Sequence, residues 1–124
     1  SPAVLDKAWY LRAMERMRET LKNPCFLLIT DDVAYAEAAF GTQADVVISR
    51  NEAVVDFALL SLCDHGILSA SSFAWWGAWF SRQRKDAPGI YLAPEYWAGH
   101  RTQEWRPPGF ITDWLTYLEG RPEP

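Results

Sequence analysis

The chain has 124 residues, of which 49% are hydrophobic and 15% aromatic, and its formal net charge is −4. This composition supplies enough apolar area for a compact core and excludes an intrinsically disordered chain. The acidic balance and the lack of a basic stripe in the sequence argue against nucleic-acid binding. The length predicts a single domain over residues 1–124.

The first predicted element is a helix that begins at Ser1 and Pro2 and ends at Asn23 and Pro24. Serine followed by proline is typical of a helix start, and a residue that precedes proline is disfavoured in helical geometry. Between these limits the apolar side chains recur at helical spacing, at Tyr10, Ala13, Met14, Met17 and Leu21.

The remaining chain alternates between strand and helix patterns. Four apolar runs have the length of strands, at residues 25–30, 44–49, 65–70 and 90–94. Such runs, without polar alternation, are typical of parallel strands that are covered on both faces. The order of elements therefore predicts an α/β domain with about four mostly parallel strands and helices on both faces.

Helices are predicted between these strands. Asp31 and Asp32 are expected to cap a helix that ends at Gly41, a role that we favour over a catalytic one. Ser49 and Glu52 have the spacing of a capping box for the next helix. That helix places one group of apolar side chains on a single side, namely Val54, Val55, Ala58, Leu59 and Leu62. A short last helix is expected within residues 111–118.

Ligands of parallel α/β sheets bind outside the carboxyl ends of the strands, so the residues after each strand are the candidate site. Ser71 and Ser72 stand at such a position, before the aromatic run FAWWGAWF. Unpaired N–H groups and the positive end of the helix dipole could hold a phosphate there. The alternative is that one serine only caps the helix. No standard nucleotide-binding glycine motif is present to decide between them.

The aromatic helix itself has two apolar faces. Phe73, Trp76, Gly77 and Phe80 fall on one face, and Trp75 falls on the other with Trp79. We favour core packing over sugar stacking for these rings, and expect burial on both sides, with a second domain as one possible cover. A glycine within a helix costs propensity, which indicates close packing at that position.

Three further residue types carry chemically active groups. Asp56 could accept two hydrogen bonds from the N1–H and N2–H₂ edge of guanine, or could be an ordinary solvated helix residue. His65 could be a general base or a phosphate donor, or a structural histidine. Cys25 and Cys63 are expected to be buried free thiols, and the sequence holds no cysteine and histidine cluster for zinc.

Residues 56–79 (DFALLSLCDHGILSASSFAWWGAW) resemble the C-terminal signature of the α-1,2-fucosyltransferases, enzymes that transfer L-fucose from GDP-fucose to a sugar hydroxyl. The matching positions are Asp56, Cys63, His65, Ile67, Ser71, Ser72, Phe73 and residues 75–78. Upstream, FLLITDD is similar to a family strand that ends in Ser-Asp-Asp, with Thr30 in place of the serine. Downstream, APEYW resembles a Pro-x-x-Trp motif. The resemblance covers about residues 8–97.

The resemblance implies a Rossmann-like, three-layer domain, as in the C-terminal half of GT-B-type fucosyltransferases, with the N-terminal half outside this chain. It implies that Ser71, Ser72 and Phe73 hold the pyrophosphate of GDP-fucose and that Asp56 reads the guanine edge. The expected donor site further includes His65 and Asp32. No metal or other cofactor is expected, and the residue that activates the acceptor hydroxyl is unassigned.

One family motif, His-x-Arg-Arg-Gly-Asp, is absent from the sequence, and in the family its arginine supports the leaving phosphate. Loss of such a donor costs roughly 10²–10³ in rate, so the isolated chain is expected to be inactive. The expected partners are a nucleotide sugar and a carbohydrate acceptor. The alternatives are a non-catalytic nucleotide-sugar-binding module and a carbohydrate-interaction module.

Localisation is expected to depend on the source, cytoplasmic or membrane-associated in a bacterium and the Golgi lumen in a eukaryote. The sequence shows no signal peptide and no apolar run long enough to span a membrane. The oligomeric state is not assigned.

Overall fold

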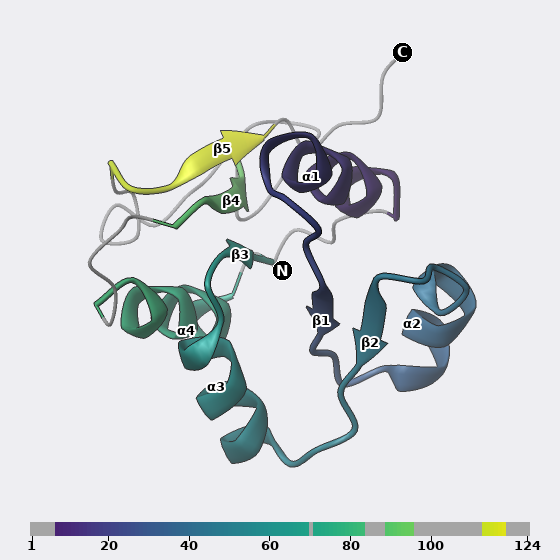
Figure 1. Ribbon diagram of the computed structural model, residues 1–124. Coiled ribbons are helices and arrows are strands. Elements are labelled where there is room, and N and C mark those ends of the chain that lie inside the picture. Colours follow the sequence, from purple (N-terminus) through teal and green to yellow (C-terminus); the bar gives the residue numbers. More distant parts are fainter. Residues whose placement is uncertain (1–6, 70, 84–88, 96–112, 119–124) are drawn as a thin grey trace.

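The computed structural model describes residues 7–69, 71–83, 89–95 and 113–118 (Figure 1). Its elements are, in chain order, α1 (Lys7–Thr20), β1 (Phe26–Leu28), α2 (Val33–Phe40), β2 (Val46–Ile48), α3 (Ala53–Leu62), β3 (Gly66–Ile67), α4 (Ser72–Gln83), β4 (Tyr91–Pro94) and β5 (Thr116–Leu118). The predicted α/β class is confirmed, since helices and short parallel strands alternate along the chain.

The strands form two small parallel sheets rather than the single sheet that we expected. In the first, β1 pairs with β2, and Phe26 lies beside Val46. In the second, β4 lies between β3 and β5, and Leu92 lies beside Ile67 on one side and Thr116 on the other. The described strands therefore number five, one more than predicted.

The additional strand replaces the helix predicted within residues 111–118, and that prediction is wrong for the described part. Residues Thr116–Leu118 form β5, and the carbonyl of Leu118 accepts a hydrogen bond from the N–H of Glu95 at 3.0 Å. The open edge of β4 offers backbone partners that a short isolated helix lacks. Residues 111 and 112 lie outside the described residues.

The three-stranded sheet is covered on both faces, as Figure 1 shows, with α1 on one side and α3 and α4 on the other. Successive side chains of a strand point to opposite faces, and β4 follows this rule. Tyr91 and Ala93 pack with Trp75 of α4, whereas Leu92 packs with Trp9 of α1. All residues of β4 are buried. The expected three-layer arrangement is therefore present around this sheet.

The helix ends follow local sequence signals. Asn23 has a φ of 52° after the end of α1, in the left-handed region that asparagine tolerates better than most residues. Asp32 caps α2, since its Oδ1 accepts the N–H of Tyr35 at 3.1 Å, and Gly41 is the C-cap. These predictions are confirmed, whereas the start predicted at Ser1 and Pro2 lies outside the described residues.

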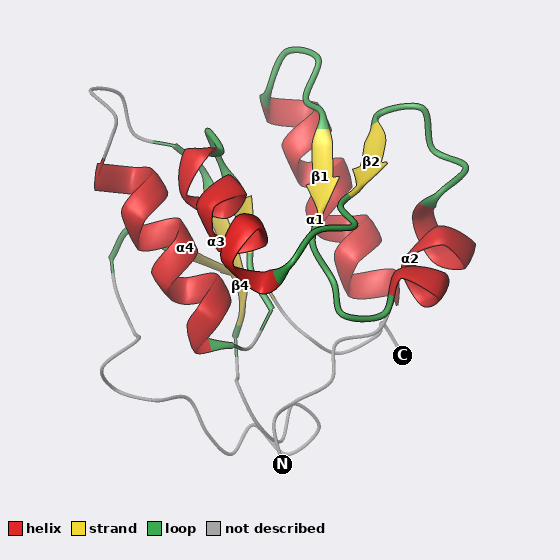
Figure 2. Ribbon diagram, turned by 90° about the horizontal axis from the view of Figure 1, so that it is seen from below, coloured by secondary structure: helices red, strands yellow, loops and turns green. Residues whose placement is uncertain are grey.

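Helices α3 and α4 pack side by side, as Figure 2 shows. A Cβ atom built on Gly77 would lie 2.9 Å from Cβ of Leu60, which is too close for a larger residue and confirms the predicted close packing. The far side of the pair remains apolar and exposed: Trp76 is 44% exposed and Val54 72%. Within the described chain α4 is therefore covered on one side only, and cover of its other side by a second domain stays a prediction.

The cysteines also differ from expectation. Cys25 is exposed, and Cys63 is half-buried with its thiol hydrogen-bonded to the carbonyl of Leu59 at 3.2 Å. Cys25 directly precedes β1, whose own residues are only half-buried. Among the described residues, no helix is both long enough and apolar enough to cross a membrane.

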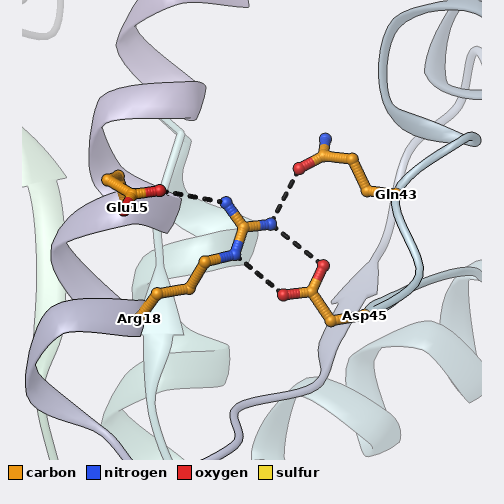
Figure 3. Close-up of polar contacts among 4 residues, drawn as sticks. All are labelled: Glu15, Arg18, Gln43 and Asp45. Carbon is orange, nitrogen blue, oxygen red and sulfur yellow. Dashed lines mark hydrogen bonds and ion pairs between the residues drawn. The ribbon is translucent and has the colours of Figure 1, made fainter.

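A cluster of polar side chains joins α1 to the start of β2 (Figure 3). The guanidinium of Arg18 donates to both carboxylate oxygens of Asp45, at 2.8 and 2.9 Å, and to Gln43 at 2.7 Å. It also lies over the ring of Phe26, 5.0 Å from the centroid. Paired donors on one carboxylate fix its position more firmly than a single contact does, so the cluster holds α1 against the β1–β2 sheet.

This cluster predicts a pH-dependent contribution to stability. Hydrogen bonding to Arg18 holds the pKa of Asp45 below its ordinary value of 3.8. The stabilisation is then fully present above pH 3.8 and is lost as the pH falls through the lower pKa of the folded chain. We expect Asp45→Asn to lower the free energy of unfolding by about 1 kcal/mol at pH 7, and by progressively less below pH 4, in urea titrations.

Glu15→Gln is the matched control, because Glu15 is exposed and its contact with Arg18 is long, at 3.5 Å against 2.8 Å for Asp45. Its effect is expected within about 0.5 kcal/mol at every pH. A cost for Asp45→Asn that stays constant down to pH 2 would contradict the assignment.

Candidate functional site

The candidate site lies where three strands end. Asp32 follows β1, Ser49 follows β2 directly, and Ser71 follows β3. Because ligands of parallel sheets bind outside the carboxyl ends of the strands, these are the positions at which a ligand is expected. The helices α2, α3 and α4 begin after these strand ends.

Ser71 is the N-cap of α4. Its carbonyl accepts the N–H of Trp75 at 3.1 Å, and its Oγ accepts the N–H of Ala74 at 3.1 Å. Its own N–H is bound to the carbonyl of Ser69 at 2.8 Å. The capping role weighed from the sequence is therefore confirmed for Ser71, and one lone pair of its hydroxyl is committed to the helix.

The first turn of α4 offers backbone donors to a ligand, because the first four N–H groups of a helix have no partner within the helix. The N–H groups of Ser72 and Phe73 are two of these. They belong to the first turn of a 12-residue helix, where the helix dipole favours negative charge. Adjacent unpaired N–H groups at a helix start are a recurrent phosphate-binding arrangement. Phe73 is 39% exposed, so this end of the helix is open.

Asp56 lies in the first turns of α3 and is 93% buried, its residual exposure being 7%. The hydroxyl of Ser49 donates to its Oδ1 at 2.6 Å. Ser49 is thus not part of the predicted capping box: the N-cap of α3 is Glu52, which makes no side-chain cap. The interpretation of Asp56 as an ordinary solvated residue is also wrong.

The starts of α3 and α4 lie close together. The rings of Phe57 and Phe73 are 5.4 Å apart in an edge-to-face arrangement, and Phe57 follows Asp56 in the chain. The part of α3 that carries Asp56 therefore contacts the first turn of α4. Together the two helices supply an acceptor suited to N–H donors and backbone donors suited to an anion.

His65 is not brought into this region. It precedes Gly66, the first residue of β3, and therefore stands at the amino end of the strand, about 13 Å from Ser69 at 3.3 Å per residue. Its Nδ1 accepts the N–H of Ile90 at 2.9 Å. A donor-site role for His65 stays a prediction and is not used below.

Asp32 lies at the correct edge but is engaged locally. Its Oδ1 caps α2, and its N–H donates to Oγ1 of Thr30 at 3.0 Å. The carboxylate is exposed, so a ligand could still reach its other oxygen. Its assignment to the donor site stays a prediction.

Two other features bear on alternative sites. No group of three or more His, Cys, Asp or Glu side chains that could hold a metal ion occurs among the described residues. A hollow of about 370 Å³ lies at the amino edge of β1 and β2, lined by Arg18, Leu21, Asn23, Pro24 and Asp45. Its charged groups already bind one another, and it faces away from the candidate site.

Sequence reasoning counted residues 49–52 among the candidate positions after a strand but assigned neither Ser49 nor Asn51 to the donor site. Oγ of Ser49 accepts a hydrogen bond from Nδ2 of Asn51 at 2.9 Å and donates to Asp56. The capping-box spacing hid this role, because it assigned Ser49 to the backbone of α3. A signal was present, since Ser49 directly follows a strand, but its partner seven residues later could not be read from spacing alone.

Comparisons with known proteins match residues 2–118 to the model of glycosyl transferase family 11. The chain is 32% identical over 94 residues to an alpha-1,2-colitosyltransferase of Escherichia coli, covering 72% of this chain and 31% of the relative. It is 30% identical over 95 residues to galactoside alpha-(1,2)-fucosyltransferase 2 of Mus musculus, covering 73% of this chain and 26% of the relative.

A third relative, the O-antigen biosynthesis glycosyltransferase WbnK of Escherichia coli, is 26% identical over 98 residues, which are 76% of this chain and 32% of the relative. The chain thus spans about a third of the length of the curated relatives that it matches. No solved structure gives a significant match.

Proposed function

Because the chain belongs to glycosyl transferase family 11, the family of the α-1,2-fucosyltransferases, we propose that it is the GDP-fucose-binding part of an inverting α-1,2-fucosyltransferase with a galactoside-type acceptor. The relatives named above include an alpha-1,2-colitosyltransferase and an alpha-(1,2)-fucosyltransferase. These names share the α-1,2 linkage but differ in the transferred sugar. The chain spans about a third of these proteins, and the activity is proposed for the longer protein.

The observations that carry the proposal are the start of α4, whose first N–H groups have no partner within the helix, and the buried carboxylate of Asp56 in the neighbouring helix α3. In the proposed complex the N–H groups of Ser72 and Phe73 bind the diphosphate. Asp56 accepts hydrogen bonds from N1–H and N2–H₂ of guanine. Adenine and uracil do not present two adjacent donors in this arrangement, so the carboxylate selects the base.

The same contacts serve the transfer step. An acceptor hydroxyl displaces GDP from the anomeric carbon with inversion, and negative charge builds up on the departing diphosphate. Backbone donors that are already aimed at this charge stabilise it without further reorganisation. The acceptor-binding part and the activating group belong to the longer protein, so the isolated chain is proposed to bind donor without transferring sugar.

Calorimetric titration of the chain with GDP, ADP and UDP tests this function. We expect binding of GDP at millimolar concentration or better, a preference over the other two nucleotides, and no change when a chelator replaces Mg²⁺. Absence of GDP binding at millimolar concentration would overturn the proposal. Binding of free oligosaccharide without any nucleotide would favour a carbohydrate-interaction module instead.

Asp56→Ala tests the base contact. Hydrogen bonds to a charged group contribute about 1.5–3 kcal/mol, so the preference for GDP over ADP is expected to fall roughly 10- to 100-fold, mainly through weaker GDP binding. Asp113→Ala is the matched control, because Asp113 is an exposed carboxylate ahead of β5 and outside the candidate site. This control should leave the preference for GDP over ADP unchanged. If Asp56→Ala also leaves that preference unchanged, the assignment of Asp56 to the base contact is wrong.

A further inference from the structure

The carboxylate of Asp56 is held by a chain of two hydrogen bonds, from Asn51 to Ser49 and from Ser49 to Asp56. Nδ2 of Asn51 is only a donor, so Oγ of Ser49 must accept from it. The single hydroxyl hydrogen of Ser49 is then directed to Oδ1 of Asp56, at 2.6 Å. The direction of both bonds is fixed by the chemistry of their end groups.

Ser49 is a rigid support for this contact. It is 6% exposed, and its N–H donates to the carbonyl of Leu28 at 2.9 Å, which ties the end of β2 to β1. The backbone of Asp56 is tied to Glu52 within α3 at 2.9 Å. The carboxylate is therefore anchored at both ends, to the sheet through Ser49 and to the helix through its own backbone.

This anchoring leaves the carboxylate incompletely satisfied. A carboxylate offers about four acceptor positions, yet within the described segments only the hydroxyl of Ser49 donates to Asp56. Buried charged groups normally find several partners, since burial without them is costly. The remaining acceptor positions match a ligand that brings two adjacent N–H donors.

We propose that Ser49, oriented by Asn51, is a positioning residue that holds the carboxylate of Asp56 for two-point recognition of guanine. The inference rests on the proposed function. It extends the guanine-binding site from Asp56 alone to the hydrogen-bonded residues Asn51, Ser49 and Asp56. A fixed carboxylate accepts from both N1–H and N2–H₂, whereas a rotating one keeps a single strong contact. Ser49 therefore acts on base selectivity through Asp56 and does not touch the nucleotide.

Inosine diphosphate is the probe for this idea, because its base keeps N1–H and lacks the exocyclic amino group. The ratio of GDP to IDP affinity reports the second hydrogen bond. We expect Ser49→Ala to lower this ratio about fivefold, with ADP binding unchanged. Ser49→Thr keeps a hydroxyl and is expected to restore the ratio. Ser61→Ala is the matched control in α3, since its hydroxyl donates to the carbonyl of Ala58 away from the first turn.

Coupling to Asp56 separates positioning from a merely structural role. In an Asp56→Ala background, Ser49→Ala should have no further effect on the GDP to IDP ratio, because the carboxylate that it holds is gone. Equal losses of GDP, IDP and ADP affinity in Ser49→Ala would overturn the proposal in favour of a structural role. So would an unchanged ratio.

The two proposals fail in different ways. If Asp56→Ala narrows the preference for GDP and Ser49→Ala leaves the GDP to IDP ratio intact, the donor-domain function stands and the positioning role is wrong. If the unsubstituted chain does not discriminate GDP from ADP, both are overturned.

Discussion

Binding of GDP is expected to fall about a hundredfold in Ser72→Asp. Position 72 is the first residue of α4, so the new carboxylate would lie beside the proposed diphosphate. Two unit charges about 5 Å apart repel by about 3 kcal/mol at an effective dielectric constant of 20, which corresponds to roughly two orders of magnitude in affinity. Titration calorimetry with GDP at low salt measures the effect.

The substitution is suited to this test because it should not harm the fold. A carboxylate in the first turn of a helix stabilises it by about 0.3–1 kcal/mol through the dipole. Thr42→Asp adds the same charge at an exposed turn before β2, on the opposite edge, and should change GDP affinity little. Unchanged binding in Ser72→Asp would remove the helix start from the site, whatever the result for Asp56.

Trp9→Ala is expected to destabilise the chain by about 3–5 kcal/mol. Trp9 is fully buried and packs with Ala13, Met17 and Leu92 between α1 and the three-stranded sheet. Its Nε1–H donates to the carbonyl of Leu118 at 3.4 Å, so the ring also ties α1 to β5. The loss is a large fraction of a typical stability of 5–15 kcal/mol, and urea unfolding followed by far-UV circular dichroism measures it.

Trp76→Ala is the matched comparison, because it removes a tryptophan side chain from an exposed position. Trp76 is 44% exposed and makes edge contacts with Trp75 and Trp79. Its cost should be less than half that of Trp9→Ala, because the burial term scales with the area removed from water. Similar costs at the two positions would contradict the layer arrangement around α1.

Local features of the chain were readable from sequence because short-range chemistry decides them. The caps at Asp32 and Ser71 use donors and acceptors within three residues of each other. The apolar spacing of α1 and the order of strands and helices depend on periodicity alone. The motif around residues 56–79 indicated the family, and the match over residues 2–118 shows it.

Tertiary structure alone decided which of these residues meet. Ser49 reaches Asp56 seven residues away only because α3 turns back over the end of β2. Leu118 forms a strand because β4 presents an open edge, and His65 falls at the amino end of β3 although it stands within the family motif. Position along the chain determines the capping, periodicity and motif of each segment. The distance between two segments in space depends on how the layers pack, and this distance cannot be read from their spacing in the sequence.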